Sequence, residues 1–260
     1  MKNKRNNELA ICGFEAVKAL EKNNADAIRR LYFTEDRAPL FGGLCKALAK
    51  KRIPYNQVEA ADLEKLCGSV HHQGVVAFID QPAIERLSKA DVDGWVERGE
   101  NALLLDRIGN ANNLGAIIRS AAFFGVKNIV IPLDEAAATV TTSTYRVAKG
   151  GMERVKVWTV QSMTRLLQDV KGRMIRFGTD VRCSTPITRM NGLRTGGTTA
   201  DGAAKMLPAI VVLGNEEHGI SDEIRENCDH LVIIPSPADD IESLNVAQAA
   251  AIILYELTRE

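Results

Sequence analysis

The spacing of apolar residues predicts a small first domain. Apolar residues recur at helical spacing in residues 9–20 and 44–49, which predicts two helices. Residues 31–33 are typical of a short strand, and the continuous apolar run 75–79 is typical of a buried strand. We therefore expect residues 1–80 to form a domain in which helices and strands alternate. The next segment, residues 81–100, carries eight charged residues together with Pro82 and Gly94, and we interpret it as a linker with one short helix.

From residue 101 onward the alternation is more regular. The expected strands are residues 102–105, 128–131, 155–158, 173–177, 209–213 and 230–234. The expected helices are residues 114–124, 162–170, 221–227 and 246–257. This order predicts an α/β domain over residues 101–260 with a mostly parallel sheet covered by helices. Residues 186–208 are rich in Gly and Thr and lack periodicity, which predicts a long flexible loop.

Composition narrows the class of protein only slightly. The 33 basic and 33 acidic residues cancel, so net charge does not indicate a nucleic-acid-binding protein. Residues 1–80 hold 13 Lys and Arg against 10 Asp and Glu, a small excess of +3. The five cysteines include no C-x-x-C pair, so we expect no metal site and reduced thiols in a cytoplasmic protein. No apolar run approaches the roughly 20 residues of a membrane helix, and no membrane association is expected.

Three polar clusters follow expected strands, in residues 112–121, 213–221 and 233–246. Ligands bind at this edge of open α/β sheets, so the clusters are candidates for one site. Each also has a purely structural interpretation. Asn113 and Ser243 are helix-capping types, and Asn245 can bond loop backbone. Arg119 can lie along its helix or pair with a carboxylate, and Glu216 can be a solvated loop residue. G-x-G-x-x-G, phosphate-loop and G-x-S-x-G motifs do not occur.

Taken together and in order, the clusters read N-x-G-x-x-x-R, G-N-E-x-x-G-I-S and I-P followed by S-L-N-V. This combination resembles the three signature motifs of the SpoU family, within the SPOUT superfamily of methyltransferases. The segments Cys-Gly-Phe-Glu-Ala-Val at 12–17 and His-Gln-Gly-Val-Val-Ala at 72–77 resemble the ribosomal-protein-like RNA-binding domain that precedes many SpoU domains.

The resemblance implies a 2′-O-ribose methyltransferase that acts on rRNA or tRNA with S-adenosylmethionine. It also implies a deep trefoil knot in the second domain and a homodimer whose sites form beside the interface. The residues that it places at the cofactor are Leu213, Gly214, Gly219, Ile234 and Leu244.

The reaction requires a group that orients the ribose hydroxyl and accepts its proton or stabilises the alkoxide. The resemblance assigns this step to Arg119. Because an arginine guanidinium is not easily deprotonated, we favour hydrogen bonding and alkoxide stabilisation over general-base catalysis. Supporting roles fall to Asn113, Glu216, Ser243 and Asn245, and the sequence does not separate them.

In the first domain we expect RNA to be held by backbone charge, and the alternative is a solvated surface. The candidate cations are Arg29, Arg30, Lys50, Lys51 and Arg52.

Departures from the family pattern leave a second function open. Glu217 stands where glycine is usual, Ala247 stands where serine is common, and residues 235–243 form a longer loop with Asp239 and Asp240. The alternative is a non-catalytic RNA-binding protein with weakened cofactor binding. A dinucleotide-dependent oxidoreductase is a weaker third interpretation, because the glycine fingerprint is missing.

Overall fold

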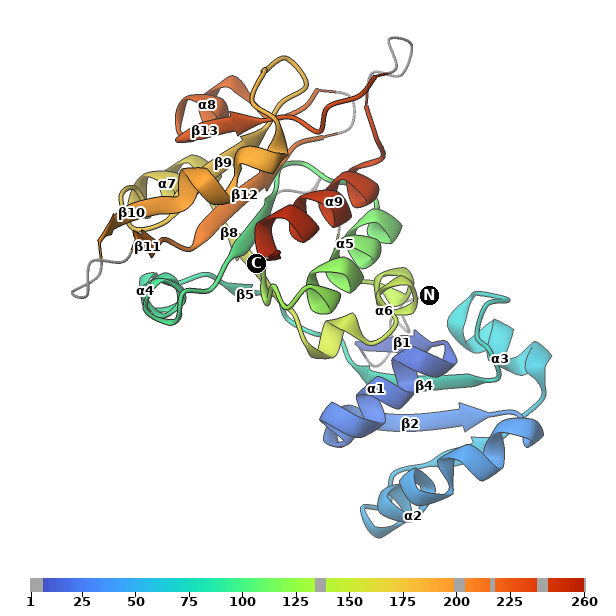
Figure 1. The fold of residues 1–260 in the computed structure, drawn as a ribbon. Helices are drawn as coiled ribbons and strands as arrows, with labels where there is room; N and C mark the ends of the chain where they lie inside the picture. The colour runs from blue at the N-terminus through green and yellow to red at the C-terminus, as the bar shows by residue number, and fades with distance from the viewer. Residues whose placement is uncertain (1–6, 134–138, 199–203, 216–217, 238–242, 260) are drawn as a thin grey trace. The chain divides into compact units, whose positions relative to one another are not determined.

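The structure is a computed structural model that describes residues 7–133, 139–198, 204–215, 218–237 and 243–259. The chain forms two compact units (Figure 1). Unit 1 consists of Met1–Ala83 and Val140–Arg154, and unit 2 of Ile84–Thr139 and Val155–Glu260.

Unit 1 is a four-stranded sheet with helices. Its strands are β1 (Glu8–Cys12), β2 (Ile28–Phe33), β3 (Tyr55–Gln57) and β4 (Val75–Asp80), in the order β1-β4-β2-β3. The pair β2–β3 is parallel and the other two pairs are antiparallel. Its α-helices are α1 (Phe14–Asn24), α2 (Gly42–Lys50), α3 (Ala60–Cys67) and α6 (Thr142–Ala148). The 3₁₀ turns are Ala25–Ala27, Glu35–Phe41 and Gly151–Glu153.

The structure corrects the expected helix over residues 9–20. Residues 8–12 form β1 instead, and the helix begins only at Phe14. Every residue of β1 is buried, so the strand has no polar alternation and its apolar run merges with the helical pattern of α1. Gly13 separates the two elements at φ 102°, a conformation that ends the strand. The expected elements at 31–33, 44–49 and 75–79 are confirmed as β2, α2 and β4.

A segment from the middle of the chain also belongs to unit 1. After β7 (Asn128–Pro132) the chain contributes α6 and a 3₁₀ turn to unit 1, and then returns as β8 (Lys156–Val160). Gly150 lies against α1, where an added Cβ would be 2.6 Å from the Cβ of Ala19. Helix α6 starts at a capping box formed by Thr141 and Thr144. Because the helix has only 7 residues, its apolar periodicity is too short to detect in the sequence.

Unit 2 contains a seven-stranded sheet that is parallel throughout its described pairs. The strand order is β13-β9-β12-β6-β7-β8-β5. Besides β7 and β8, the strands are β5 (Glu85–Arg86), β6 (Ala102–Leu105), β9 (Ile175–Thr179), β12 (Ala209–Leu213) and β13 (His230–Val232). The helices are α4 (Lys89–Arg98), α5 (Ala111–Phe123), α7 (Met163–Asp169), α8 (Asp222–Glu226) and α9 (Val246–Thr258). The predicted α/β class with a small preceding α/β domain is therefore confirmed, whereas the knot stays a prediction.

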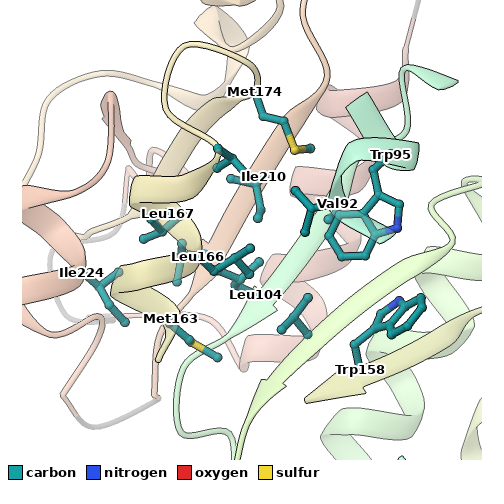
Figure 2. Close-up of a cluster of buried hydrophobic side chains, with 14 of the residues drawn as sticks. Val92, Trp95, Leu104, Trp158, Met163, Leu166, Leu167, Met174, Ile210 and Ile224 are labelled. Carbon is teal, nitrogen blue, oxygen red and sulfur yellow. The ribbon is translucent and has the colours of Figure 1, made fainter. Parts of the chain in front are cut away.

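The core of unit 2 explains why residues 84–98 do not form a linker. Figure 2 shows Val92 and Trp95 of α4 beside Leu104 and Trp158 of the sheet. The two indole rings meet edge to face with centroids 6.0 Å apart, and both side chains are buried. The Trp158 indole N–H also donates to Asn128 Oδ1 at 3.3 Å. The single tryptophan of α4 therefore anchors a segment whose charged composition suggested an exposed linker.

Residues 186–208, expected to be a flexible loop, contain regular structure where they are described. Short 3₁₀ turns at Ile187–Arg189 and Asn191–Arg194 precede a two-stranded ribbon of β10 (Thr195–Thr198) and β11 (Ala204–Met206). Within the described ranges, no helix is long and apolar enough to cross a bilayer. The same ranges contain no cluster of three His, Cys, Asp or Glu side chains that could hold a metal ion. All five cysteines are free thiols.

A buried arginine ties this segment to the last helix. Arg194 donates from Nη1 to the Leu257 carbonyl at 3.0 Å and from Nε to the Leu207 carbonyl at 3.0 Å. Its Nη2 donates to Asn101 Oδ1 at 3.0 Å. Burial lowers the pKa of Arg194, because the charged form loses water. A cation at the C-terminus of α9 is favoured by the helix dipole, which offsets part of this cost.

We expect Arg194→Met to lower the free energy of unfolding by about 2–4 kcal/mol, because the Leu257 and Leu207 carbonyls and Asn101 Oδ1 lose the Arg194 donor, and the bond to Leu257 is buried. Urea denaturation of the full chain measures this. Arg189→Met, which changes an exposed arginine one turn away, is the matched control and should have an effect near zero. Equal effects of the two substitutions would show that Arg194 does not tie α9 to the fold.

Candidate active site at the strand ends

The loop after β12 is held in a tight conformation. The chain turns back after Gly214, so that Asn215 N donates to the Gly219 carbonyl at 3.1 Å and Gly219 N donates to the Asn215 carbonyl at 2.9 Å. A Cβ at Gly214 would lie 2.2 Å from the carbonyl carbon of Gly219 and 2.4 Å from Ile220 N. Gly219 has φ +64°, a conformation that favours glycine. Both glycines of the second motif are therefore required by backbone geometry.

A buried carboxylate connects this loop to the neighbouring strand β6. Asp106 follows β6 directly, and its Oδ2 accepts a hydrogen bond from Ser221 N at 3.3 Å. Its backbone N–H donates to the Leu213 carbonyl at 2.8 Å. Both Asp106 oxygens also accept from Arg107, at 3.2 Å each. The sequence interpretation missed Asp106, although an acidic residue directly after an apolar strand was a usable signal.

Arg107 adds a second connection between the end of β6 and the second motif. Its carbonyl accepts a hydrogen bond from Asn215 Nδ2 at 3.0 Å, while its backbone has φ 57°. The left-handed conformation costs free energy for a residue with a Cβ, and here it points the carbonyl at the amide of Asn215. The ends of β6 and β12 are thus joined by both side-chain and backbone contacts.

The first and third motifs meet where α5 and α9 lie side by side (Figure 1). Asn245 Nδ2 donates to Asn113 Oδ1 at 3.3 Å. Asn245 is also the N-cap of α9, because its Oδ1 accepts from Ala247 N at 2.9 Å. The structure corrects two expected caps. Asn110, not Asn113, caps α5, and Ser243 is an exposed residue two positions before the cap of α9.

Arg119 lies on α5, further along the helix than Asn113. Its side chain is exposed, and in the described part of the chain it forms no ion pair. The structural alternative of an arginine held by a carboxylate therefore has no support among these residues. Glu216 and Glu217 lie outside the described residues, as do Asp239 and Asp240 of the longer loop.

The expected cofactor residues differ in their exposure. Leu213 is buried at the end of β12, Ile234 is half-buried and Leu244 is exposed. The residue before Ile234 is hydrogen-bonded to the segment 185–187. Ile233 N donates to the Thr185 carbonyl and Ile187 N donates to the Ile233 carbonyl, each at 2.9 Å. The three motifs therefore lie at the carboxyl ends of β6 and β12 and beyond β13.

Three of the five cations expected to hold RNA are engaged within unit 1. Arg29 pairs with Asp80 at 2.7 Å, Arg30 pairs with Glu8, and Lys51 pairs with Asp26. Lys50 and Arg52 are exposed, and neither forms an ion pair within the described ranges.

Comparison with known families agrees with this arrangement. The SpoU rRNA Methylase family matches residues 100–255, which hold all three motifs. The chain belongs to the SpoU rRNA methylase family. A second family, RNA 2′-O ribose methyltransferase substrate binding, matches residues 10–84 in unit 1. Membership makes the chain an RNA 2′-O-methyltransferase, which is the class that the motifs indicated.

Relatives match over most of the chain. A 23S rRNA (guanosine-2′-O-)-methyltransferase RlmB of Xanthomonas campestris is 31% identical over 96% of both chains. An uncharacterized tRNA/rRNA methyltransferase of Mycobacterium avium is 35% identical over 82% of this chain and 64% of its own length. Among solved structures, an RNA 2′-O ribose methyltransferase aligns with TM-score 0.75 and 19% identity over 98% of this chain and 89% of its own. The SpoU methyltransferase AviRb from Streptomyces viridochromogenes, in complex with AdoMet, aligns with TM-score 0.73 and 22% identity over 98% and 91%.

We expect Gly214→Ala to lower the free energy of unfolding by about 1–3 kcal/mol, because the added methyl group meets backbone atoms that cannot move independently. Chemical denaturation of the full chain tests this. Gly192→Ala is the control, since a Cβ added there would meet no atom within 4 Å. If Gly214→Ala is as stable as Gly192→Ala, the described packing of the second motif is wrong.

Proposed function

We propose that this SpoU enzyme methylates a guanosine 2′-hydroxyl of 23S rRNA, using S-adenosylmethionine. The observation that carries the choice of RNA is the match to the Xanthomonas RlmB, which extends over 96% of both chains and therefore includes the substrate-binding unit. The Mycobacterium avium relative, named for tRNA or rRNA, matches over a smaller share of each chain. A tRNA substrate is the second candidate and is an outcome of the experiment below.

The residues of the second motif fit the proposed cofactor. A Cβ added at Gly219 would meet no atom within 4 Å, so a ligand can approach the backbone closely at this glycine. Leu213, Ile234 and Leu244 would supply apolar contacts around it. Bound S-adenosylmethionine supplies an electrophilic methyl group on a sulfonium centre.

Arg119 is proposed to act on the ribose hydroxyl. Its guanidinium is exposed on α5 and can donate two parallel hydrogen bonds. It would orient the hydroxyl and stabilise the negative charge that develops on oxygen as the proton leaves to solvent. The Asn245–Asn113 hydrogen bond holds the start of α5 against the start of α9, so these two residues would position the helix that carries Arg119. Glu216 and Ser243 keep their proposed supporting roles.

We expect Arg119→Ala to reduce methyl transfer by roughly 10²–10⁴-fold, the scale for losing a positioned charge-stabilising group. Tritium transfer from labelled cofactor to a 23S rRNA transcript, with a tRNA pool in parallel, measures this. Calorimetric affinity for S-adenosylmethionine and the melting temperature should stay unchanged, because the Arg119 side chain is exposed and forms no ion pair with any described residue.

Two variants sharpen this experiment. Arg119→Lys should restore little activity, because an ammonium lacks the planar fork. Arg165→Ala removes another exposed helical arginine, on α7, and should leave transfer unchanged. Near-normal transfer by folded Arg119→Ala would remove Arg119 from the mechanism. No cofactor binding by the wild-type chain would instead favour the non-catalytic RNA-binding alternative.

The same helix pair presents an apolar surface that we propose a second copy covers. Phe123 of α5 is 82% exposed and lies one turn beyond Arg119 on the same helix. Tyr255 of α9 is 54% exposed, and its ring is 6.3 Å from that of Phe124. Large exposed aromatic residues on two adjacent helices are typical of an interface. A partner bound there would approach Arg119, as the family resemblance implies.

Light scattering of the full chain should give twice the 28.4 kDa chain mass at micromolar concentration. Phe123→Glu should give a folded monomer, because a carboxylate cannot be buried unpaired at such an interface. Val181→Glu changes another exposed apolar residue of unit 2 and should leave the dimer intact. A wild-type monomer would refute the homodimer.

A further inference from the structure

A basic surface runs from α2 into β3 in unit 1. Residues 37–58 contain five Lys and Arg residues and no Asp or Glu. Lys46 and Lys50 of α2 are both exposed and stand four residues apart, a spacing at which like charges repel on a helix. The other three cations that were expected to hold RNA each pair with a carboxylate of unit 1. Lys46, Lys50 and Arg52 form no ion pair with any described residue.

Arg52 occupies a backbone position that glycine would fill at lower cost. After α2 ends, Arg52 N donates to the Ala49 carbonyl and Ile53 N to the Leu48 carbonyl, each at 3.0 Å. This is the pattern of a Schellman C-terminal motif, whose left-handed residue is usually glycine. Arg52 holds that place at φ 56°, and no contact of its exposed side chain within the described chain compensates for the strain. Glycine at position 52 would therefore be more stable than arginine, so the arginine indicates a role for a cation at this point.

Strand β3 follows immediately and is the open edge of the sheet. Among the described strands it pairs with β2 alone, and all three of its residues are exposed. Tyr55 is 38% exposed, and Asn56 and Gln57 add amide donors and acceptors. Arg52 and Tyr55 are three residues apart, so their Cα atoms are at most about 11 Å apart. The helix C-terminus thus places cations next to an exposed aromatic ring and exposed amide groups.

We propose that Lys46, Lys50, Arg52 and Tyr55, the α2–β3 surface, bind an unpaired segment of the substrate RNA. The three cations contact successive phosphates, and Tyr55 stacks on an unpaired base. A tyrosine ring at a sheet edge can reach only a base that is free of a duplex, since stacked and paired bases hide their faces. This inference rests on the proposed function for the identity of the RNA. Compared with the RNA contacts expected from the sequence, the α2–β3 surface adds Lys46 and Tyr55 and omits the paired cations.

The test measures RNA binding by the full-length protein. The probes are a labelled single-stranded fragment of 23S rRNA and a duplex of the same sequence, titrated at several salt concentrations. The variant Lys50→Gln/Arg52→Gly removes two phosphate contacts, so the slope of log affinity against log salt should fall by about 1.4. Its melting temperature should be unchanged or higher, because glycine suits the left-handed position. Lys22→Gln/Lys171→Gln removes two exposed charges elsewhere and should leave the slope unchanged.

Tyr55→Leu separates base stacking from charge. It should weaken single-strand binding roughly 10- to 100-fold and leave duplex binding unchanged, because a base–aromatic stack is lost. Unchanged single-strand affinity of Tyr55→Leu, or an equal loss of salt slope in the control pair, would overturn the proposal. If the wild-type chain binds RNA through this surface but transfers no methyl group, the proposed function fails while the surface stands.

Discussion

The crowding of backbone around Gly214 is the constraint on which the rest of the site depends. Within the loop after β12, the backbone of Gly219 and Ile220 lies so close to Gly214 that no side chain fits at Gly214. Asp106 and Arg107 then hold this loop against the end of β6. Because β6 and β12 are adjacent parallel strands, this contact fixes the second motif against the segment that leads from β6 to the first motif. The third motif joins them through Asn245 and Asn113.

The sequence predicted the central sheet well because its strands are buried on both faces. Residues 102–105 and 209–213 are continuous apolar runs, and they match β6 and β12 in full. The same property hid β1, whose apolar run continues into α1. The misassigned linker and the undetected α6 have another cause. Their positions depend on contacts between residues that are distant in the sequence, such as Trp95 with Trp158 and Gly150 with Ala19, which no local pattern records.

The site was recognisable from its motifs, but individual roles were not. Asn113 and Ser243 are residue types that often cap helices, yet Asn110 caps α5 and Asn245 caps α9. The reason is that capping depends on where the backbone enters the helix. The expected RNA contacts show the same limit. A count of cations cannot distinguish Arg29, which faces Asp80, from Arg52, which faces no carboxylate among the described residues. Conversely, the left-handed backbone that makes Arg107 and Arg52 unusual appears only in three dimensions.

Mass-spectrometric mapping of ribose methylation in 23S rRNA tests most directly whether this SpoU chain methylates a ribose of rRNA through the site on α5. The cells to compare contain the wild-type chain, lack it, or contain only Arg119→Ala. We expect one 2′-O-methylguanosine that disappears without the chain and that Arg119→Ala does not restore. An unchanged set of 23S rRNA ribose methylations in cells that lack the chain would contradict this function.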